Sequence, residues 1–103
     1  MPSVSAMGIP WYSPEDYPQI RKIMIDADGL PNSYTDWLRR AEAAERRIVN
    51  GGRQVIRAMI VPEQFSIWCK IRAFRCDSKS RGRFAAEKAR DAMATTRKMR
   101  NAF

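Results

Sequence analysis

The chain has 103 residues, 45% of them hydrophobic and 29% charged, and its formal net charge is +8. This length allows a single domain, 1–103, with one modest core, and the composition excludes an intrinsically disordered chain. The sequence has neither the roughly 20 consecutive apolar residues of a membrane span nor the apolar run of a signal peptide, so we expect a soluble, cytoplasmic protein without a membrane partner.

The first predicted elements are an extended segment and a helix. Met7 to Tyr12 is short, apolar and interrupted by Pro10, which is typical of an edge strand or an extended arm and excludes a central strand. Asp16 as N-cap and Pro18 in the first turn then predict a helix that continues until Gly29 stops it.

The second predicted helix has the strongest pattern in the chain. Ser33 followed by Asp36 resembles a capping box, and Asn50 with the two glycines after it marks the end. Between these residues an apolar stripe recurs at helical spacing: Tyr34, Trp37, Leu38, Ala41, Ala44 and Ile48.

Gln54 to Val61 is rich in branched apolar residues and too short for a typical helix, so it predicts a buried strand. Its backbone groups need a partner strand, which is either the segment Met7 to Tyr12 or the same strand of a second copy. The sequence leaves both alternatives open. Because the chain offers so few strands, a homodimer is a reasonable hypothesis.

Pro62 begins the third predicted helix, and Glu63 favours its positive end. This helix has two apolar faces, the first with Phe65, Trp68 and Cys69 and the second with Ile67, Ile71 and Phe74. A helix that is apolar over more than half its circumference is covered on two sides, so it is either the centre of the fold or part of a subunit interface.

A fourth helix is predicted to follow an N-cap at Ser78 and to fray over about residues 95–103. Its apolar seam is narrow: Phe84, Ala85, Ala89, Ala92 and Met93. Together the elements predict an α+β fold, mainly α, with four helices and one or two short strands in the order β-α-α-β-α-α.

The net charge is concentrated in the last third of the chain, where residues 70–103 hold eleven Lys or Arg against three acids. Arg83, Arg90 and Arg97 recur every seven residues and therefore lie along one line of the fourth helix, roughly 21 Å long. Lys79 extends the same line. A solvated face with helical ion pairs is the alternative explanation, but three acids cannot neutralise eleven bases.

Enzymatic chemistry has little support in the sequence. Histidine is absent, which removes the commonest general base and the commonest transition-metal ligand. The two cysteines, Cys69 and Cys76, cannot build an ordinary zinc site without histidine and are expected to be free thiols. Gly51 and Gly52 are followed by Arg53 and not by the pattern of a phosphate-binding loop. We therefore predict a protein that is not an enzyme, with no catalytic residues, no cofactor and no bound metal.

Two functional hypotheses remain. In the first, the basic line of the fourth helix contacts nucleic acid or an acidic protein by neutralising its negative charge. In the second, the protein is a homo-oligomeric interaction module with no role in nucleic-acid binding. Its interface is then formed by strand 54–61 and by Ile67, Ile71 and Phe74.

Several motifs extend over most of the chain. They are Ile9-Pro10-Trp11-Tyr12 with Glu15-Asp16-Tyr17-Pro18, then Tyr34, Asp36-Trp37-Leu38 and Ala41-Glu42 through Glu45-Arg46, and then Pro62, Phe65 and Trp68-Cys69. On these motifs the chain resembles a family of small uncharacterised bacterial proteins of similar length. That family has no assigned activity, cofactor or binding residues, so the resemblance implies nothing about function.

The opening Glu15-Asp16-Tyr17-Pro18 is also similar to the first helix of some acetyltransferases of the GNAT type. Only this helix matches. The chain is too short for such an enzyme and has no acetyl-CoA pyrophosphate loop, so we reject that interpretation.

Overall fold

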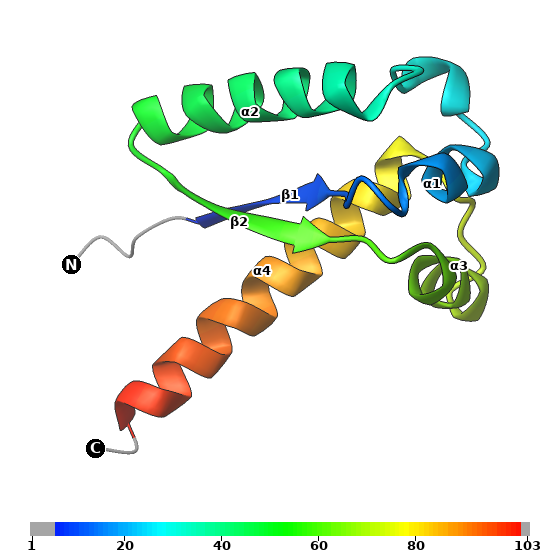
Figure 1. The fold of residues 1–103 in the computed structure, drawn as a ribbon. Helices are drawn as coiled ribbons and strands as arrows, with labels where there is room; N and C mark the ends of the chain where they lie inside the picture. Colours follow the sequence, from blue (N-terminus) through cyan, green and yellow to red (C-terminus); the bar gives the residue numbers. More distant parts are fainter. Residues whose placement is uncertain (1–5, 102–103) are drawn as a thin grey trace.

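The structure, a computed structural model, describes the backbone of residues 6–101 and the side chains of residues 6–94. Its elements are, in chain order, β1 (Ala6–Trp11), α1 (Tyr17–Ile23), the short 3-10 helix η1 (Ala27–Gly29), α2 (Tyr34–Asn50), β2 (Gln54–Met59), α3 (Pro62–Ile71) and α4 (Ser78–Asn101) (Figure 1). The predicted α+β class, mainly α, and the predicted order β-α-α-β-α-α are confirmed.

The two strands form a parallel sheet in which Ala6 is opposite Gln54 and Trp11 is opposite Met59. The segment with α1, η1 and α2 is the long crossover that parallel neighbours require. The partner of β2, which the sequence left open, is therefore β1 of the same chain. Within the described residues each strand has one neighbour, so each keeps one edge without a partner strand.

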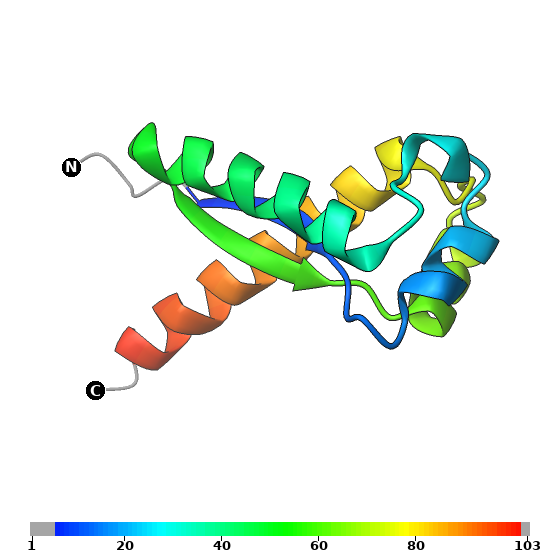
Figure 2. The ribbon, with the colours of Figure 1, turned by 45° about the horizontal axis from the view of Figure 1, so that its top comes forward.

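Helices cover both faces of this sheet. In Figures 1 and 2, α2 lies along one face and α4 crosses the other, while α1 and α3 pack together beside one end of the strands. Helix α4 approaches β1 closely at Gly8, where an added Cβ atom would collide with the carbonyl oxygen of Ala85. Only glycine fits there, because it has no side chain.

The core combines apolar residues from every layer: Trp11, Tyr12, Tyr17, Ile20, Met24, Trp37, Ile60, Phe65, Cys69 and Phe84. Phe84, Ala85 and Ala89 of the predicted seam on α4 are buried, whereas Ala92 is exposed. The seam is shorter than predicted because α4 extends past the end of the sheet (Figure 1).

Two predicted boundaries of the first half need correction. The first helix ends at Ile23, before Gly29 is reached, and the Ile25 N–H instead donates to the carbonyl of Cys76 at 2.9 Å. Asp16 makes no side-chain cap, and the oxygen that caps this turn is Ser13 Oγ, which accepts from the Asp16 N–H at 3.2 Å.

The caps of the longer helices were predicted more closely. Ser33 Oγ accepts from the Asp36 N–H at 3.1 Å, which confirms the cap of α2. On α4 the capping side chain is Asp77 and not Ser78, because the Asp77 carboxylate accepts from the Ser80 N–H at 3.0 Å. The cap therefore lies one residue earlier than predicted.

The longest helix is α4, with 24 residues. Within the described part of the chain, neither α4 nor any other helix combines the length and the apolar character needed to cross a membrane. The backbone of α4 continues to Asn101, and the side chains from residue 95 on lie outside the described residues, so the fraying predicted over about residues 95–103 stays a prediction.

Candidate functional site

Three of the four basic residues predicted on α4 have described side chains. Lys79, Arg83 and Arg90 are exposed, and among the described residues none of them is paired with a carboxylate. Arg97 also belongs to α4, but its side chain lies outside the described residues. Arg83 and Arg90, one seven-residue repeat apart, line the same surface hollow.

This hollow forms where α3 ends, before Phe74, which the sequence pattern placed on the helix. The helix stops at Ile71, and Ala73 then adopts a φ of 57°, in the left-handed region that is uncommon for residues other than glycine. The chain reverses there, and the Phe74 N–H donates to the carbonyl of Cys69 at 2.9 Å.

The reversal moves Phe74 away from the apolar face on which the sequence placed it. Its ring lies 5.7 Å from the ring of Trp68, centre to centre, with the two planes tilted by 60°. Ile67 and Ile71 remain on the outside of α3, 59% and 75% exposed. Two of the three predicted interface residues are therefore solvent-facing, and the third belongs to the hollow.

We call this hollow the α3–α4 groove. It has a volume of about 520 Å³ and is lined by Trp68, Arg72, Phe74, Arg83, Ala86, Glu87 and Arg90. A volume of this size is ordinary for a ligand site. Its lining combines two aromatic rings with three guanidinium groups.

Two of the three guanidinium groups, those of Arg72 and Arg83, lie on the aromatic rings. The central carbon of the Arg72 guanidinium is 4.3 Å from the centre of the Trp68 ring, and that of Arg83 is 4.9 Å from the centre of the Phe74 ring. Both distances are within the range of cation–π attraction. Each ring of the groove therefore carries a positive charge next to its face.

Glu87 is the single acid among the residues that line the groove. Its carboxylate accepts from Arg72 at 3.3 Å and not from Arg83, which stands four residues before it on α4. Three positive charges thus share one negative charge. The groove is electropositive because, among the described residues, no carboxylate lies within ion-pair distance of Arg83 or Arg90.

The basic surface continues past the groove toward the start of α4. A smaller hollow of about 190 Å³ is lined by Ala73, Phe74, Arg75, Asp77, Lys79, Ser80 and Arg83. The acid there, Asp77, is engaged in capping α4. Since Arg83 lines both hollows, one surface connects Lys79 with Arg90.

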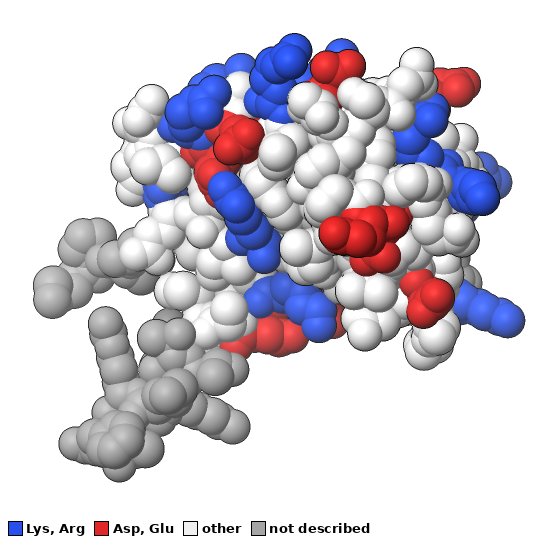
Figure 3. All heavy atoms as spheres, viewed as in Figure 1, with Lys and Arg blue, Asp and Glu red and all other residues white. Residues whose placement is uncertain are grey.

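The basic residues of α2 have a different setting. On the face drawn in Figure 3, the Lys and Arg side chains along the upper edge, where Figure 1 shows α2, are interspersed with Asp and Glu. Arg39, for example, lies 3.6 Å from Asp36 with both side chains largely exposed. This is an ordinary solvated helix face.

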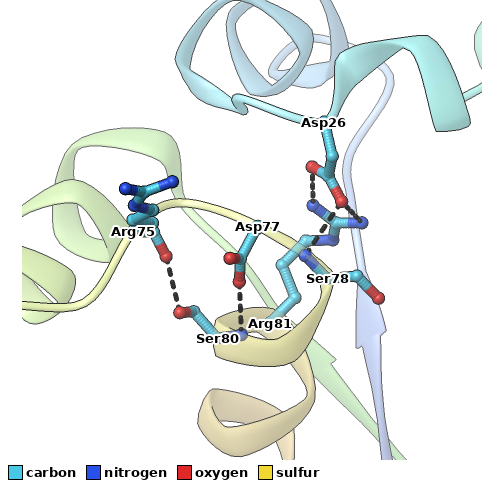
Figure 4. A network of polar contacts seen from close by, with 6 residues as sticks. All are labelled: Asp26, Arg75, Asp77, Ser78, Ser80 and Arg81. Atoms are coloured by element: carbon cyan, nitrogen blue, oxygen red, sulfur yellow. Dashed lines mark hydrogen bonds and ion pairs between the residues drawn. The ribbon is translucent and has the colours of Figure 1, made fainter.

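A network of hydrogen bonds holds the start of α4 in place (Figure 4). The Arg81 guanidinium donates to both carboxylate oxygens of Asp26, at 2.8 and 3.2 Å, and the Ser78 N–H donates to the same carboxylate at 2.9 Å. The hydrogen bond from Arg81 lowers the pKa of Asp26 below its ordinary value. Ser80 Oγ adds a bond to the carbonyl of Arg75. Arg81 is therefore a structural base, distinct from the exposed bases around it.

The two cysteines are free thiols, Cys69 buried and Cys76 half-buried. Burial raises the pKa of the Cys69 thiol to about 12, and its neighbour Cys76 adds to this effect. A thiol of this kind stays protonated and is a poor nucleophile. Within the described residues, no group of three or more Cys, Asp or Glu side chains is placed to hold a metal ion.

Sequence reasoning missed two residues of the groove. Trp68 was assigned to a covered apolar face, and Arg72 was counted only as part of the net charge. Their four-residue spacing places the Arg72 guanidinium beside the Trp68 ring, and this pattern is readable in the sequence. The pairing of Arg72 with Glu87 depends on how α3 and α4 meet and has no local pattern.

Comparisons of the chain with protein-family models, with curated proteins and with solved structures found no match.

Proposed function

We propose that the protein is a non-enzymatic binding protein that contacts nucleic acid through the α3–α4 groove and the basic side of α4. The observation that supports this proposal is the composition of the groove, in which three arginines and two aromatic rings surround one carboxylate. Arginines that neutralise phosphates release condensed counterions, which supplies affinity without sequence preference.

The aromatic rings favour nucleic acid over an acidic protein as the partner. Asp and Glu side chains offer negative charge alone, whereas a nucleotide offers a phosphate and a base with a π face. Trp68 and Phe74 add little to the recognition of carboxylates, but they match the second group of a nucleotide.

The first experiment is a titration of a fluorescently labelled oligonucleotide at about 50 and 200 mM salt, followed by anisotropy. We expect the affinity to fall steeply between the two concentrations. An affinity that does not change with salt contradicts the proposal. Binding to polyglutamate without binding to any oligonucleotide assigns the surface to an acidic protein partner instead.

The second experiment locates the binding surface. Arg83→Glu combined with Arg90→Glu reverses two exposed charges seven residues apart on α4, and Arg39→Glu combined with Arg46→Glu makes the same change at the same spacing on α2. We expect the first pair to weaken binding by about ten-fold or more and to reduce the salt slope by about two, with little effect from the second pair. Equal losses in both variants mean that net charge alone attracts the oligonucleotide.

Helix content measured by circular dichroism should not change in either double variant, because all four side chains are exposed. A triple variant that adds Arg97→Glu extends the test to the rest of the predicted basic line. Unfolding of the double or the triple variant of α4 would contradict the assignment of these arginines to the side of α4 opposite its apolar seam.

A second candidate function, homo-oligomerisation, has its own supporting observation. Ile67 and Ile71 are exposed on α3, Met59 is 48% exposed at the end of β2, and the outer edge of β2 has no partner strand within the described residues. Exposed apolar side chains and a free strand edge are both typical of an interface between copies. A mass in solution twice that of the chain, abolished by Ile67→Lys with Ile71→Lys and accompanied by no affinity for oligonucleotides, supports this function over the first.

A further inference from the structure

We infer that the α3–α4 groove takes unpaired bases of a single-stranded nucleic acid. Trp68 and Phe74 provide the two stacking positions, and the arginines beside them meet the phosphates. This inference rests on the proposed function, and it names the class of nucleic acid that the same site binds.

The first step concerns access. Trp68 and Phe74 form part of the lining of a hollow between two helices, and their outer faces are next to guanidinium groups. A duplex presents phosphates and groove edges to a protein, and its base faces are stacked inside. A base reaches these rings only when it is unpaired and turned out of a stack.

The second step concerns the stack itself. The Trp68 ring is nearly parallel to the ring of Phe65, at 5.9 Å and 14°, and the ring of Phe84 meets it edge-on at 5.4 Å and 87°. Phe65 and Phe84 are buried, so they fix the orientation of Trp68. The Arg72 guanidinium lies over the same ring, and a base extends this stack by lying on the guanidinium plane or by replacing it.

The third step concerns the relative orientation of the two positions. The planes of Trp68 and Phe74 are inclined by 60° at a distance of 5.7 Å. Neighbouring bases in a duplex are parallel, so they do not match two inclined rings. A flexible single strand with splayed bases does match them.

The fourth step concerns the phosphates. Arg90 follows Arg83 by seven residues, roughly 10.5 Å along the axis of α4. Within the described residues it has no carboxylate partner. It is therefore available to a phosphate that follows the stacked bases along the helix.

The test compares three DNA probes of equal length: a mixed-sequence single strand, the corresponding duplex, and an abasic strand that keeps the sugar and phosphates but has no bases. We expect the single strand to bind about ten-fold more tightly than the abasic strand, because stacking contributes per base, while both keep a similar salt slope. The duplex should also bind more weakly than the single strand. Tryptophan fluorescence gives a second signal, because Trp11 and Trp37 are 4% and 7% exposed and Trp68 is the tryptophan at the surface.

We expect the single strand to quench this fluorescence and the abasic strand to leave it unchanged. Trp68→Phe should remove the quenching. Phe74→Leu should lower the affinity for the single strand toward that for the abasic strand and leave the affinity for the abasic strand unchanged. This variant tests the inference independently if replacement of Trp68 disturbs the fold.

Two results overturn the inference in distinguishable ways. Equal, salt-sensitive affinity for the single and abasic strands, without quenching, leaves the proposed function intact and shows that the groove reads phosphates alone. If no probe binds in a salt-sensitive manner, the proposed function fails together with the inference.

Discussion

The protein has two aromatic clusters that differ in one respect. The closed cluster, formed by Trp11, Tyr12, Tyr17, Tyr34 and Trp37, lies where β1, α1 and α2 meet, and its rings approach one another to between 4.7 and 5.9 Å. The open cluster, formed by Phe65, Trp68, Phe74 and Phe84, lies between α3 and α4 at similar ring distances. Four of the five rings of the closed cluster are buried, whereas Trp68 and Phe74 of the open cluster are half-buried.

Both clusters carry an arginine over a tryptophan. Over Trp11, the Arg57 guanidinium is held by two hydrogen bonds of 2.7 Å to the carboxylate of Glu45. Over Trp68, the Arg72 guanidinium makes one contact of 3.3 Å with Glu87 and donates one hydrogen bond of 3.3 Å to the carbonyl of Trp68. A bidentate pair neutralises and fixes the first arginine, whereas the second keeps more freedom to meet a ligand.

The comparison teaches that an arginine on an aromatic ring is not by itself a binding site. In the closed cluster the Arg57 guanidinium lies over Trp11 and is bonded to Glu45, so it serves the packing of the fold. In the open cluster the arginine on the ring stands beside Arg83 and Arg90, which have no acid partner among the described residues. The burial of the rings and the bidentate pairing of the arginine over Trp11 separate the structural role from the proposed binding role.

The largest expected difference between the clusters is in stability. Trp37→Ala removes a buried ring that contacts four other aromatic rings, and we expect it to lower the free energy of unfolding by about 3–5 kcal/mol. Trp68→Ala should cost less, because part of that ring is already exposed. Urea denaturation of both variants measures the difference, and equal losses contradict the division into a closed and an open cluster.

An alkaline titration addresses the closed cluster from another direction. Burial raises the pKa of Tyr12 to about 12, above the ordinary value of 10. Burial disfavours the charged phenolate, so the folded state binds the Tyr12 proton more tightly than the unfolded state does. The free energy of unfolding is therefore unaffected by this group below pH 10, and it falls by roughly 3 kcal/mol as the pH rises from 10 toward 12.

We expect Tyr12→Phe to lack this part of the decline. Burial also raises the pKa of Cys69 to about 12, so the decline that remains in the variant includes the contribution of that thiol. Denaturation midpoints measured between pH 9 and 12 test the prediction. Parallel curves for the two proteins would falsify it.

Arg81 and Arg83, two residues apart on α4, allow a structural arginine to be compared with a proposed binding arginine in the same helix. Arg81, with 10% of its side chain exposed, is bonded to Asp26 and lines a hollow with Tyr12, whereas Arg83 lies over Phe74 in the open cluster. We expect Arg81→Gln to lower stability by about 1.5–3 kcal/mol, because it leaves a carboxylate without its charged partner. Arg83→Gln should change stability by no more than about 0.5 kcal/mol and should weaken oligonucleotide binding.

Thermal denaturation and anisotropy measured on the same two proteins give the result. The reverse pattern, a destabilised Arg83 variant and a silent Arg81 variant, contradicts the assignment of the two arginines.

The order of the elements was predictable because local residues specify it. Ser33 at the start of α2, the glycines after its end and Pro62 at the start of α3 each act on the backbone next to them. The end of α3 was not predictable in this way. Ala73 takes a left-handed φ that is usually marked by glycine or asparagine, so the sequence gives no sign of the reversal.

The site was predictable to a similar degree. The seven-residue spacing of Arg83 and Arg90 depends on α4 alone and was readable, and both side chains are exposed as expected. Arg83 and Arg90 line one groove with Trp68 and Phe74 because the chain reverses at Ala73. Long-range placement of this kind comes from packing between α3 and α4, which single-sequence patterns do not contain.

The smallest expected effect concerns the arginine that closes the first cluster. The hydrogen bonds from Arg57 lower the pKa of Glu45, so the pair adds stability above the ordinary carboxyl pKa and loses it as the pH falls through the lowered value. We expect Arg57→Gln to cost less than about 1 kcal/mol at neutral pH, because both groups are partly exposed, and to reduce the loss of stability below about pH 4. Urea denaturation at pH 7 and pH 3 measures both quantities. If Arg57→Gln also weakens oligonucleotide binding as strongly as Arg72→Gln, the guanidinium of the closed cluster is as available to a ligand as that of the open cluster, and the contrast between them does not define the site.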